Sequence, residues 1–485
     1  MQPIKNLFFA TAIAGTVIIV AGGISTLALM KIGNSDNIDI PTGKLLARNV
    51  TNLLETKCAA CHGDNPEFNP LLNALSGGLM QRDIEQGQRD FRLSELYGDT
   101  NPDARRMQGI ATLKLDKVLR ANSMPPVTYT AMHWGSTLNA YDRKLLSSYF
   151  DIPFINDLRF MPIEPIDMSK LNPDRVLLGQ KLFNSGALST DGTISCASCH
   201  DLTKGGTDNK QYSEGVRKQL GGVNAPTVYN ASHNFIQFWD GRAKDLKAQA
   251  GGPPLNPVEM GFENKPESWN TIVANIKQDP ELVALFAKAY PKAGINADTI
   301  TDAIATYEHT LVTPDSDFDL YLKGDKNALT AEQKKGMHLF IEYGCATCHA
   351  GAGLGGQSYE YISKHADFFN GKTLAQNAPM GRHDATKKNI DQLCFKVPNL
   401  RNVELTHPYL HDGSAKTLDE AVVKMLQTQS GIPHPTRSDV SAIVSFLKAQ
   451  TGKLNGIPVN KLTKEQALAP AVTVAAPAPV QQNIQ

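Results

Sequence analysis

This chain of 485 residues has few cysteines, no excess of either charge and very few long apolar runs. Seven cysteines are too sparse for a disulfide scaffold, which concentrates many more in a short secreted domain. Lysine and arginine total 48 and aspartate and glutamate total 48, so the basic excess typical of nucleic-acid binders is missing. Apolar residues make up 41%, which allows a sizeable core and excludes wholesale disorder. At about 150 residues per domain, the length predicts three domains.

The one long apolar segment stands at the N-terminus. The uncharged run 7–30, between Lys5 and Lys31, would as a helix reach about 36 Å and cross a hydrocarbon core of about 30 Å. A cleaved secretory signal is the alternative, but its apolar region is usually only about 7–15 residues, and no clear small-residue cleavage site follows. We therefore predict an uncleaved membrane anchor at 1–33, with the rest of the chain exported. The tail 465–485 is rich in Ala, Pro, Val and Gln and is predicted to be disordered.

Six of the seven cysteines form three copies of one short pattern, Cys-x-x-Cys-His. The copies are Cys58, Cys61 and His62; Cys196, Cys199 and His200; and Cys345, Cys348 and His349. Two thiols three positions apart can both add to the vinyl groups of one haem, and the adjacent histidine then reaches the iron. A single copy could instead bind structural zinc or act as a redox pair. Three copies with the histidine in place indicate three covalently bound c-type haems.

Helical periodicity precedes each copy of the pattern. Apolar residues recur at helical spacing over 46–54 before the first copy, and the related segments GQKLF (179–183) and GMHLF (336–340) precede the other two. Strand-like alternation is scarce, and Pro and Gly crowd the connections. We therefore predict a mostly α protein with three cytochrome c domains in tandem after the anchor. These domains are predicted at 34–160, 161–325 and 326–464.

The sixth iron ligand separates haems that only transfer electrons from haems that react with small molecules. For the first haem we predict Met124, because the prolines that follow it stiffen a loop that must hold a thioether against iron. The alternatives left open for this haem are Met80, Met107, Met132 and His133. For the third haem we predict Met425, with Met380 as the weaker alternative. Met/His ligation raises the potential of a haem and suits it to receive and store an electron.

The second haem lacks an obvious sixth ligand. No methionine lies between His200 and Met260. His233 and His309 are available, but a lone histidine more often packs or caps an element than binds iron. The sequence therefore predicts an open iron position at this haem, where a small molecule can react.

Several motifs follow one another over about residues 170–452. They are NAPT (224–227), FWDGRA (238–243), Gln249, NPVEMG (256–261), VPNLRN (397–402) and THPYLHDG (406–413). In order and spacing they resemble the signature of the bacterial di-haem cytochrome c peroxidases, which are related to MauG. With an extra haem domain and an anchor in front, the chain resembles the membrane-bound tri-haem quinol peroxidases. We therefore expect it in the bacterial inner membrane, with its haem domains in the periplasm.

The resemblance implies roles for single residues. The second haem would be peroxidatic, with Gln249 and Glu259 over its open face. Glu259 would shuttle a proton between the peroxide oxygens, whereas Gln249 could only orient peroxide by hydrogen bonding. Trp239 lies where the family has a residue between two haems, and Met425 matches the distal ligand of the electron-transferring haem.

The resemblance also implies a calcium ion between domains. Its ligands would be Asn224 and the backbone carbonyls of Thr406 and Pro408. The seventh cysteine, Cys394, matches no motif and is predicted to be a small buried residue.

One departure from the family concerns the loop before the NAPT motif. Di-haem members often carry a histidine there that closes the oxidised peroxidatic iron. By spacing that position is Val216, and the loop 205–222 contains neither histidine nor methionine. We therefore expect an enzyme that is open when fully oxidised and needs no reductive activation.

The expected reaction is the reduction of hydrogen peroxide to water with electrons from membrane quinol. The alternatives are a soluble cytochrome c or cupredoxin donor, a non-enzymatic multihaem carrier, a MauG-like oxidase of a protein substrate, and a haem-based sensor. Met425 disfavours the MauG-like reading, since MauG has a tyrosine as that ligand, and no output domain of a sensor is visible. We expect no nucleic-acid partner, and the oligomeric state is left open, with a homodimer among the options.

Overall fold

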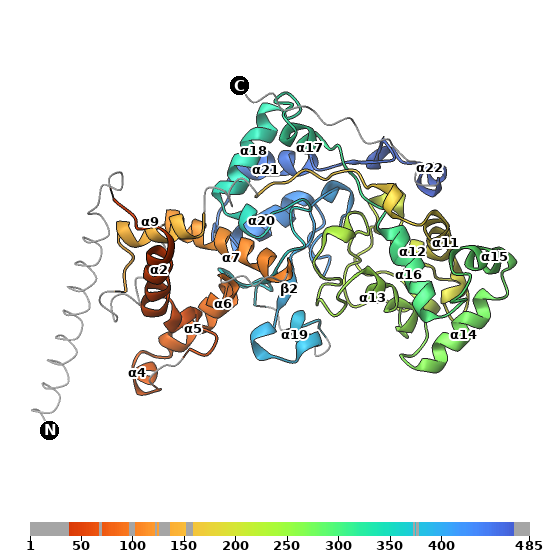
Figure 1. Ribbon diagram of the computed structural model, residues 1–485, viewed down its shortest axis with the longest axis horizontal. Coiled ribbons are helices and arrows are strands. Elements are labelled where there is room, and N and C mark those ends of the chain that lie inside the picture. The colour runs from red at the N-terminus through yellow and green to blue at the C-terminus, as the bar shows by residue number, and fades with distance from the viewer. Residues whose placement is uncertain are drawn as a thin grey trace, which may run out of the picture. The chain divides into compact units, whose positions relative to one another are not determined.

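Figure 1 shows the computed structural model of the chain. It describes residues 38–66, 70–96, 102–121, 124–125, 136–151, 159–371, 374 and 378–469. The chain divides into two compact units between Arg159 and Phe160. The run 7–30, predicted to be the anchor, lies outside the described residues, and among those described no helix is long and apolar enough to cross a bilayer.

The first unit is helical. Its helices are α2 (Gly43–Lys57), α3 (Ala59–His62), α4 (Pro70–Leu75), α5 (Leu79–Asp90), α6 (Leu93–Leu96), α7 (Pro102–Ala121) and α9 (Ala140–Tyr149). The apolar residues predicted at helical spacing form the buried face of α2, where Val50, Leu53 and Leu54 are all nearly inaccessible to solvent. Helix α2 packs against α9, which begins at a capping box between Asn139 and Asp142.

The second unit contains both remaining Cys-x-x-Cys-His copies. Its helices are α11 (Pro173–Phe183), α12 (Cys196–Cys199), α13 (Leu246–Ala250), α14 (Pro266–Ile276), α15 (Pro280–Ala289), α16 (Ala297–Glu308), α17 (Asp317–Leu322), α18 (Ala331–Glu342), α19 (Arg382–Thr386), α20 (Leu418–Thr428), α21 (Arg437–Lys448) and α22 (Lys464–Leu468). Strands β1 (Tyr359–Tyr361) and β2 (Cys394–Lys396) pair antiparallel, as do β3 (Lys453–Leu454) and β4 (Ile457–Pro458). The prediction of a mostly helical fold is confirmed; the boundary at 325/326 inside this unit stays a prediction.

Short 3-10 helices fill the connections of the second unit. They are η2 (Met168–Lys170), η3 (Gly186–Leu188), η4 (Leu202–Lys204), η5 (Val216–Lys218), η6 (Ala231–His233), η7 (Pro253–Leu255), η8 (Cys345–Thr347), η9 (Asn389–Asp391), η10 (Val403–Leu405) and η11 (Val459–Lys461). The first residues of the predicted tail, 465–468, are helical because they belong to α22, whereas residues 470–485 lie outside the described part of the chain. Thr463 and Gln466 form a capping box at the start of α22, and Ala467 is buried against the core, so this turn is held in place.

The repeated segments at 179–183 and 336–340 have a common structural cause. Each lies in a helix that crosses a later one closely, α11 against α16 and α18 against α21. A Cβ atom at Gly179 would lie 1.9 Å from the Ala303 carbonyl oxygen, and one at Gly336 would lie 1.9 Å from that of Ala442. Glycine therefore allows the backbones of each pair of helices to touch. In the sequence, the two helices of each pair flank one Cys-x-x-Cys-His segment.

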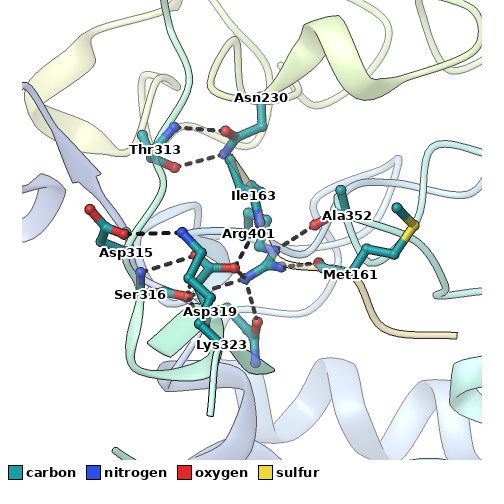
Figure 2. A network of polar contacts seen from close by, with 12 residues as sticks. Met161, Ile163, Asn230, Thr313, Asp315, Ser316, Asp319, Lys323, Ala352 and Arg401 are labelled. Carbon is teal, nitrogen blue, oxygen red and sulfur yellow. Dashed lines mark hydrogen bonds and ion pairs between the residues drawn. The ribbon is translucent and has the colours of Figure 1, made fainter. Parts of the chain in front are cut away.

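A buried ion pair fastens the connections of the second unit (Figure 2). Arg401 Nη1 lies 2.9 Å from Asp319 Oδ1, and both side chains are fully buried. Arg401 also donates to the carbonyl oxygens of Met161, at 3.0 Å, and Ala352, at 2.7 Å. Asp319 accepts the backbone N–H of Ile163 at 2.9 Å. One pair of charges thus holds the entry to the unit, helix α17 and the loop after the third haem motif together.

Candidate active site

Each of the three histidines of the repeated pattern is oriented by a backbone carbonyl. The Nδ1–oxygen distances are 3.0 Å from His62 to Phe91, 3.3 Å from His200 to Gly206 and 3.0 Å from His349 to Leu354. A ring that donates its Nδ1–H to a carbonyl keeps Nε2 free as an iron ligand. Burial lowers the pKa of His200 and His349, which favours the neutral ring that can offer a lone pair. The three rings therefore fit proximal haem ligands.

The six paired cysteines are half-buried free thiols. Burial is the largest cause that raises the pKa of Cys58 to about 12 and the pKa of Cys61 and Cys199 to about 11. Such thiols stay protonated in the protein without a bound group. In the described ranges no group of three or more histidine, cysteine or acidic side chains is placed to hold a metal ion. The paired cysteines with their adjacent histidines fit covalent attachment of haem.

Glu259 lies beside the second pair of cysteines. Its negative charge contributes to raising the pKa of both Cys196 and Cys199. Burial raises the pKa of Glu259 itself, partly offset by Arg242 and by a hydrogen bond of 2.7 Å in which Asn256 Nδ2 donates to Oε1. The structure thus places a shielded carboxyl, held by one amide, next to the second haem attachment site.

Gln249 and Glu259 are carried by one short stretch of chain. Gln249 is half-buried on α13, whose N-terminus is capped by Asp245 accepting the Ala248 N–H at 2.7 Å. Helix η7 follows directly and leads to the turn of Glu259. At the end of α13, a Cβ atom at Gly252 would come within 2.9 Å of the Phe238 ring. This close approach fixes where α13 lies, and with it the position of Gln249.

The loop in which the family often has a histidine packs on the backbone of Glu259. Val216 is fully buried, and its N–H donates to the carbonyl oxygen of Glu259 at 2.9 Å. A Cβ atom at the preceding Gly215 would lie 2.0 Å from the Val258 carbonyl oxygen, so the two backbones touch. Sequence spacing singled out Val216, and the structure places it against the candidate acid.

Trp239 links two segments that follow the second and the third haem motif in the sequence. Its Nε1 donates to the Asn224 carbonyl at 2.9 Å, and its own carbonyl accepts the Lys396 N–H at 2.8 Å. The ring of His411 lies edge-on with a centroid distance of 6.4 Å. The sequence alone assigned no role to Lys396 or His411, because both lie far from Trp239 along the chain.

The predicted calcium ligands belong to two segments that the structure joins. The Asn224 N–H donates to the His411 carbonyl at 2.8 Å, which ties it to the loop that carries Thr406 and Pro408. The side chain of Asn224 is buried, and its Nδ2 donates to the Lys210 carbonyl at 2.8 Å. Calcium binding at this junction stays a prediction.

The predicted methionine ligands are both half-buried. Met124 lies in the first unit, and Met425 lies on α20, where its carbonyl accepts the Gln429 N–H at 2.8 Å. Of the alternatives, Met80 on α5 and Met380 are also half-buried, whereas Met132, His133 and the side chain of Met107 lie outside the described residues. The methionine assignments stay predictions. Cys394 is buried, as its lack of a motif suggested.

Comparison with known proteins decides the family. A family model described as a haem-binding domain matches residues 29–152, and one described as di-haem cytochrome c peroxidase matches residues 173–327. The cytochrome c peroxidase of Escherichia coli K12 is 43% identical over 413 residues, which cover 82% of this chain and 86% of the relative. The chain belongs to the di-haem cytochrome c peroxidase family. The resemblance found in the motifs is thereby confirmed, including the additional N-terminal haem-binding domain.

Two further matches each cover 60% of this peroxidase. The cytochrome c551 peroxidase of Nitrosomonas europaea is 46% identical over 292 residues, covering 60% of this chain and 84% of the relative. Among solved structures, a MauG-like protein associated with microbial copper homeostasis is 26% identical with a TM-score of 0.53, covering 60% of this chain and 94% of that one. Both matches leave about two fifths of the chain uncovered.

Proposed function

We propose that this peroxidase reduces hydrogen peroxide with electrons from membrane quinol, which pass through the N-terminal haem and the third haem to the second. Family membership makes it an oxidoreductase that acts on hydrogen peroxide. Each turnover consumes one peroxide, two electrons and two protons and releases two water molecules. The observation that best supports this active site is the half-buried Glu259 carboxyl beside Cys196 and Cys199.

Haem, when attached at the three pairs of cysteines, supplies the iron that cleaves the O–O bond and the orbitals that store electrons. The chain's own part is to bind peroxide and to move a proton. When haem is attached, Glu259 would take a proton from one peroxide oxygen and return it to the other, and burial raises its pKa so that it holds a proton more readily. Asn256 holds the carboxyl at 2.7 Å, and Gln249 orients peroxide by hydrogen bonding.

The electron path uses Trp239. Cys196, Cys199 and His200 would hold the haem that supplies one electron, and Cys345, Cys348, His349 and the proposed ligand Met425 would hold the haem that supplies the other. The hydrogen bonds of Trp239 to Asn224 on one side and to Lys396 on the other support this path, because Asn224 follows the second haem motif in the sequence and Lys396 follows the third. The carbonyls of Thr406 and Pro408, with Asn224, are the proposed calcium ligands that stiffen this junction.

Quinol is the favoured donor because the apolar run 7–30 precedes the N-terminal haem-binding domain in the sequence. As an inner-membrane anchor it would keep the periplasmic haem domains near the quinol pool. The names of the relatives favour a second candidate, a soluble cytochrome c as donor.

An anaerobic assay separates the two donors. Full-length protein in detergent is mixed with a reduced short-chain quinol and hydrogen peroxide, and both are followed. Quinol as donor predicts one quinol oxidised per peroxide, and in the Glu259→Gln control both rates should fall together by at least about tenfold. Absent quinol oxidation, together with rapid oxidation of reduced cytochrome c, would establish the soluble donor instead.

A further inference from the structure

Lys396, the last residue of strand β2, is a buried cation without an acidic partner in the described chain. Only 5% of the residue is exposed, and burial alone lowers its pKa to about 8. The acids on neighbouring segments have partners of their own: Asp240 pairs with Arg242, and Asp391 lies 3.9 Å from Arg382. Within the ranges described, no carboxylate lies within ion-pairing distance of the Lys396 ammonium.

An isolated ammonium is costly to bury. Lysines are almost never fully buried unless they are paired, because transfer of a charge from water to an apolar interior is strongly unfavourable. The lowered pKa reports the same cost, since burial disfavours the charged form. Lys396 is therefore placed to meet an anion that the polypeptide itself does not supply.

The position of Lys396 indicates which anion this is. In the antiparallel pair of β1 and β2, Lys396 lies opposite Tyr359. Its backbone N–H donates to the Trp239 carbonyl. Two residues later, the Pro398 carbonyl oxygen packs on Gly355, 2.0 Å from where a Cβ atom would stand, and the His349 Nδ1 lies 3.2 Å from the same point. The backbone at Lys396 thus runs between Trp239 and the segment that packs beside the proximal ligand of the third haem. Each haem carries two propionate carboxylates, which are the anions this chain acquires when it is loaded.

We propose that the Lys396 ammonium binds a propionate of the haem attached at Cys345 and Cys348, and holds that edge of the haem beside Trp239. Lys396 is then a positioning residue for electron transfer, and its positive charge favours the reduced state of the third haem. The inference rests on haem attachment at this site and holds whichever donor reduces the enzyme.

The test compares full-length, haem-loaded variants by spectroelectrochemical titration. Lys396→Met removes the charge and should lower the equilibrium constant for reduction of the third haem about tenfold, a shift of about 59 mV for one electron. Lys396→Arg keeps the charge and should restore most of that shift. Lys388→Met removes an exposed lysine from the same part of the chain and should leave the potential unchanged.

A vibrational measurement covers the case in which Lys396→Met does not fold. In the Lys396→Arg protein, a guanidinium replaces the ammonium at the carboxylate, so the propionate bands of the third haem in the resonance Raman spectrum should shift. Identical bands in Lys396→Arg and wild type would overturn the proposal. So would a third-haem potential unaltered by Lys396→Met, or a shift confined to the second haem.

Discussion

Glu259 has a carboxyl group that can carry a proton. The residue is half-buried, and this burial raises the pKa of the carboxyl. Changing Glu259 to Gln keeps the size and the contact with Asn256 but removes the proton carrier. Because general acid–base catalysis typically contributes about 10²–10⁴-fold, peroxide turnover should fall at least about tenfold. The variant should also lose the acidic limb of the pH–rate profile, which a merely structural role would not move.

The matched control is Glu263→Gln, four residues further along the chain. Glu263 is exposed and pairs with Lys265 at the surface, so its removal should change neither turnover nor pH profile. Undiminished turnover in Glu259→Gln would assign the proton transfer to another group.

Glu308, the last residue of α16, offers a residue-scale prediction about stability. It is 4% exposed, its Oε2 has no hydrogen-bond partner in the described chain, and burial raises its pKa to about 8. An unfolded glutamate releases its proton near pH 4.3, whereas the folded one keeps it. Folding is therefore penalised increasingly from about pH 4.3 up to about pH 8, by about 1.4 kcal/mol per pH unit.

Replacing Glu308 with Gln removes this penalty and keeps the shape. The variant should gain a few kcal/mol in unfolding free energy at about pH 8 and almost nothing at about pH 4. Denaturant titration of the haem-loaded protein at both pH values measures the difference. An equal effect at both would show that Glu308 is ionised in the folded protein.

At the scale of elements, the loop around η5 holds the position at which the family often has a histidine that closes the second iron. Val216 provides no iron ligand, and its backbone is bonded to Glu259. The oxidised enzyme should therefore show a high-spin ferric signal from the second haem in its EPR spectrum and react with peroxide without prior reduction. A low-spin, six-coordinate second haem in the oxidised protein would contradict this expectation.

A pair of variants makes the loop prediction sharper. Val216→His introduces an imidazole at the position where the family often has one, and should add a low-spin component and a need for pre-reduction. Val216→Leu changes the side-chain volume without a ligand and should keep the high-spin signal. If both variants behave alike, packing rather than ligation controls the iron.

The helices and loops also show which features of the fold can be predicted from the sequence and which cannot. The haem motifs and the helical segments ahead of them were visible in the sequence, because both depend on short spacings along one segment. The contact of Trp239 with Lys396 and the pair of Arg401 and Asp319 were not, since they join residues far apart in the chain. The tail was assigned by composition alone, so the local cap at Thr463 that orders its first turn was missed.

On the scale of the whole molecule, the chain separates one haem motif from the other two. The first motif lies in the unit that ends at Arg159, and the second and third share the other unit. In the proposed function, the catalytic step and the storage of its second electron would therefore belong to one compact body. The first unit is then left with a single task in the proposed function, the transfer of electrons from the donor.

This division predicts that damage to the first haem affects electron supply and not peroxide chemistry. Met124→His replaces the proposed thioether ligand by an imidazole, which should lower the potential of the first haem, because Met/His ligation raises it. Quinol-driven turnover should then fall about tenfold or more. Peroxide reduction by enzyme that has been chemically reduced beforehand should proceed in its first turnover at the wild-type rate, since the second and third haems are unchanged.

Met80→His, at a half-buried methionine of the same unit, is the matched control and should leave both rates intact. If Met80→His lowers the first-haem potential and Met124→His does not, the thioether ligand is on α5. If Met124→His slows the first turnover as well, the first haem takes part in peroxide chemistry and the relay role is wrong.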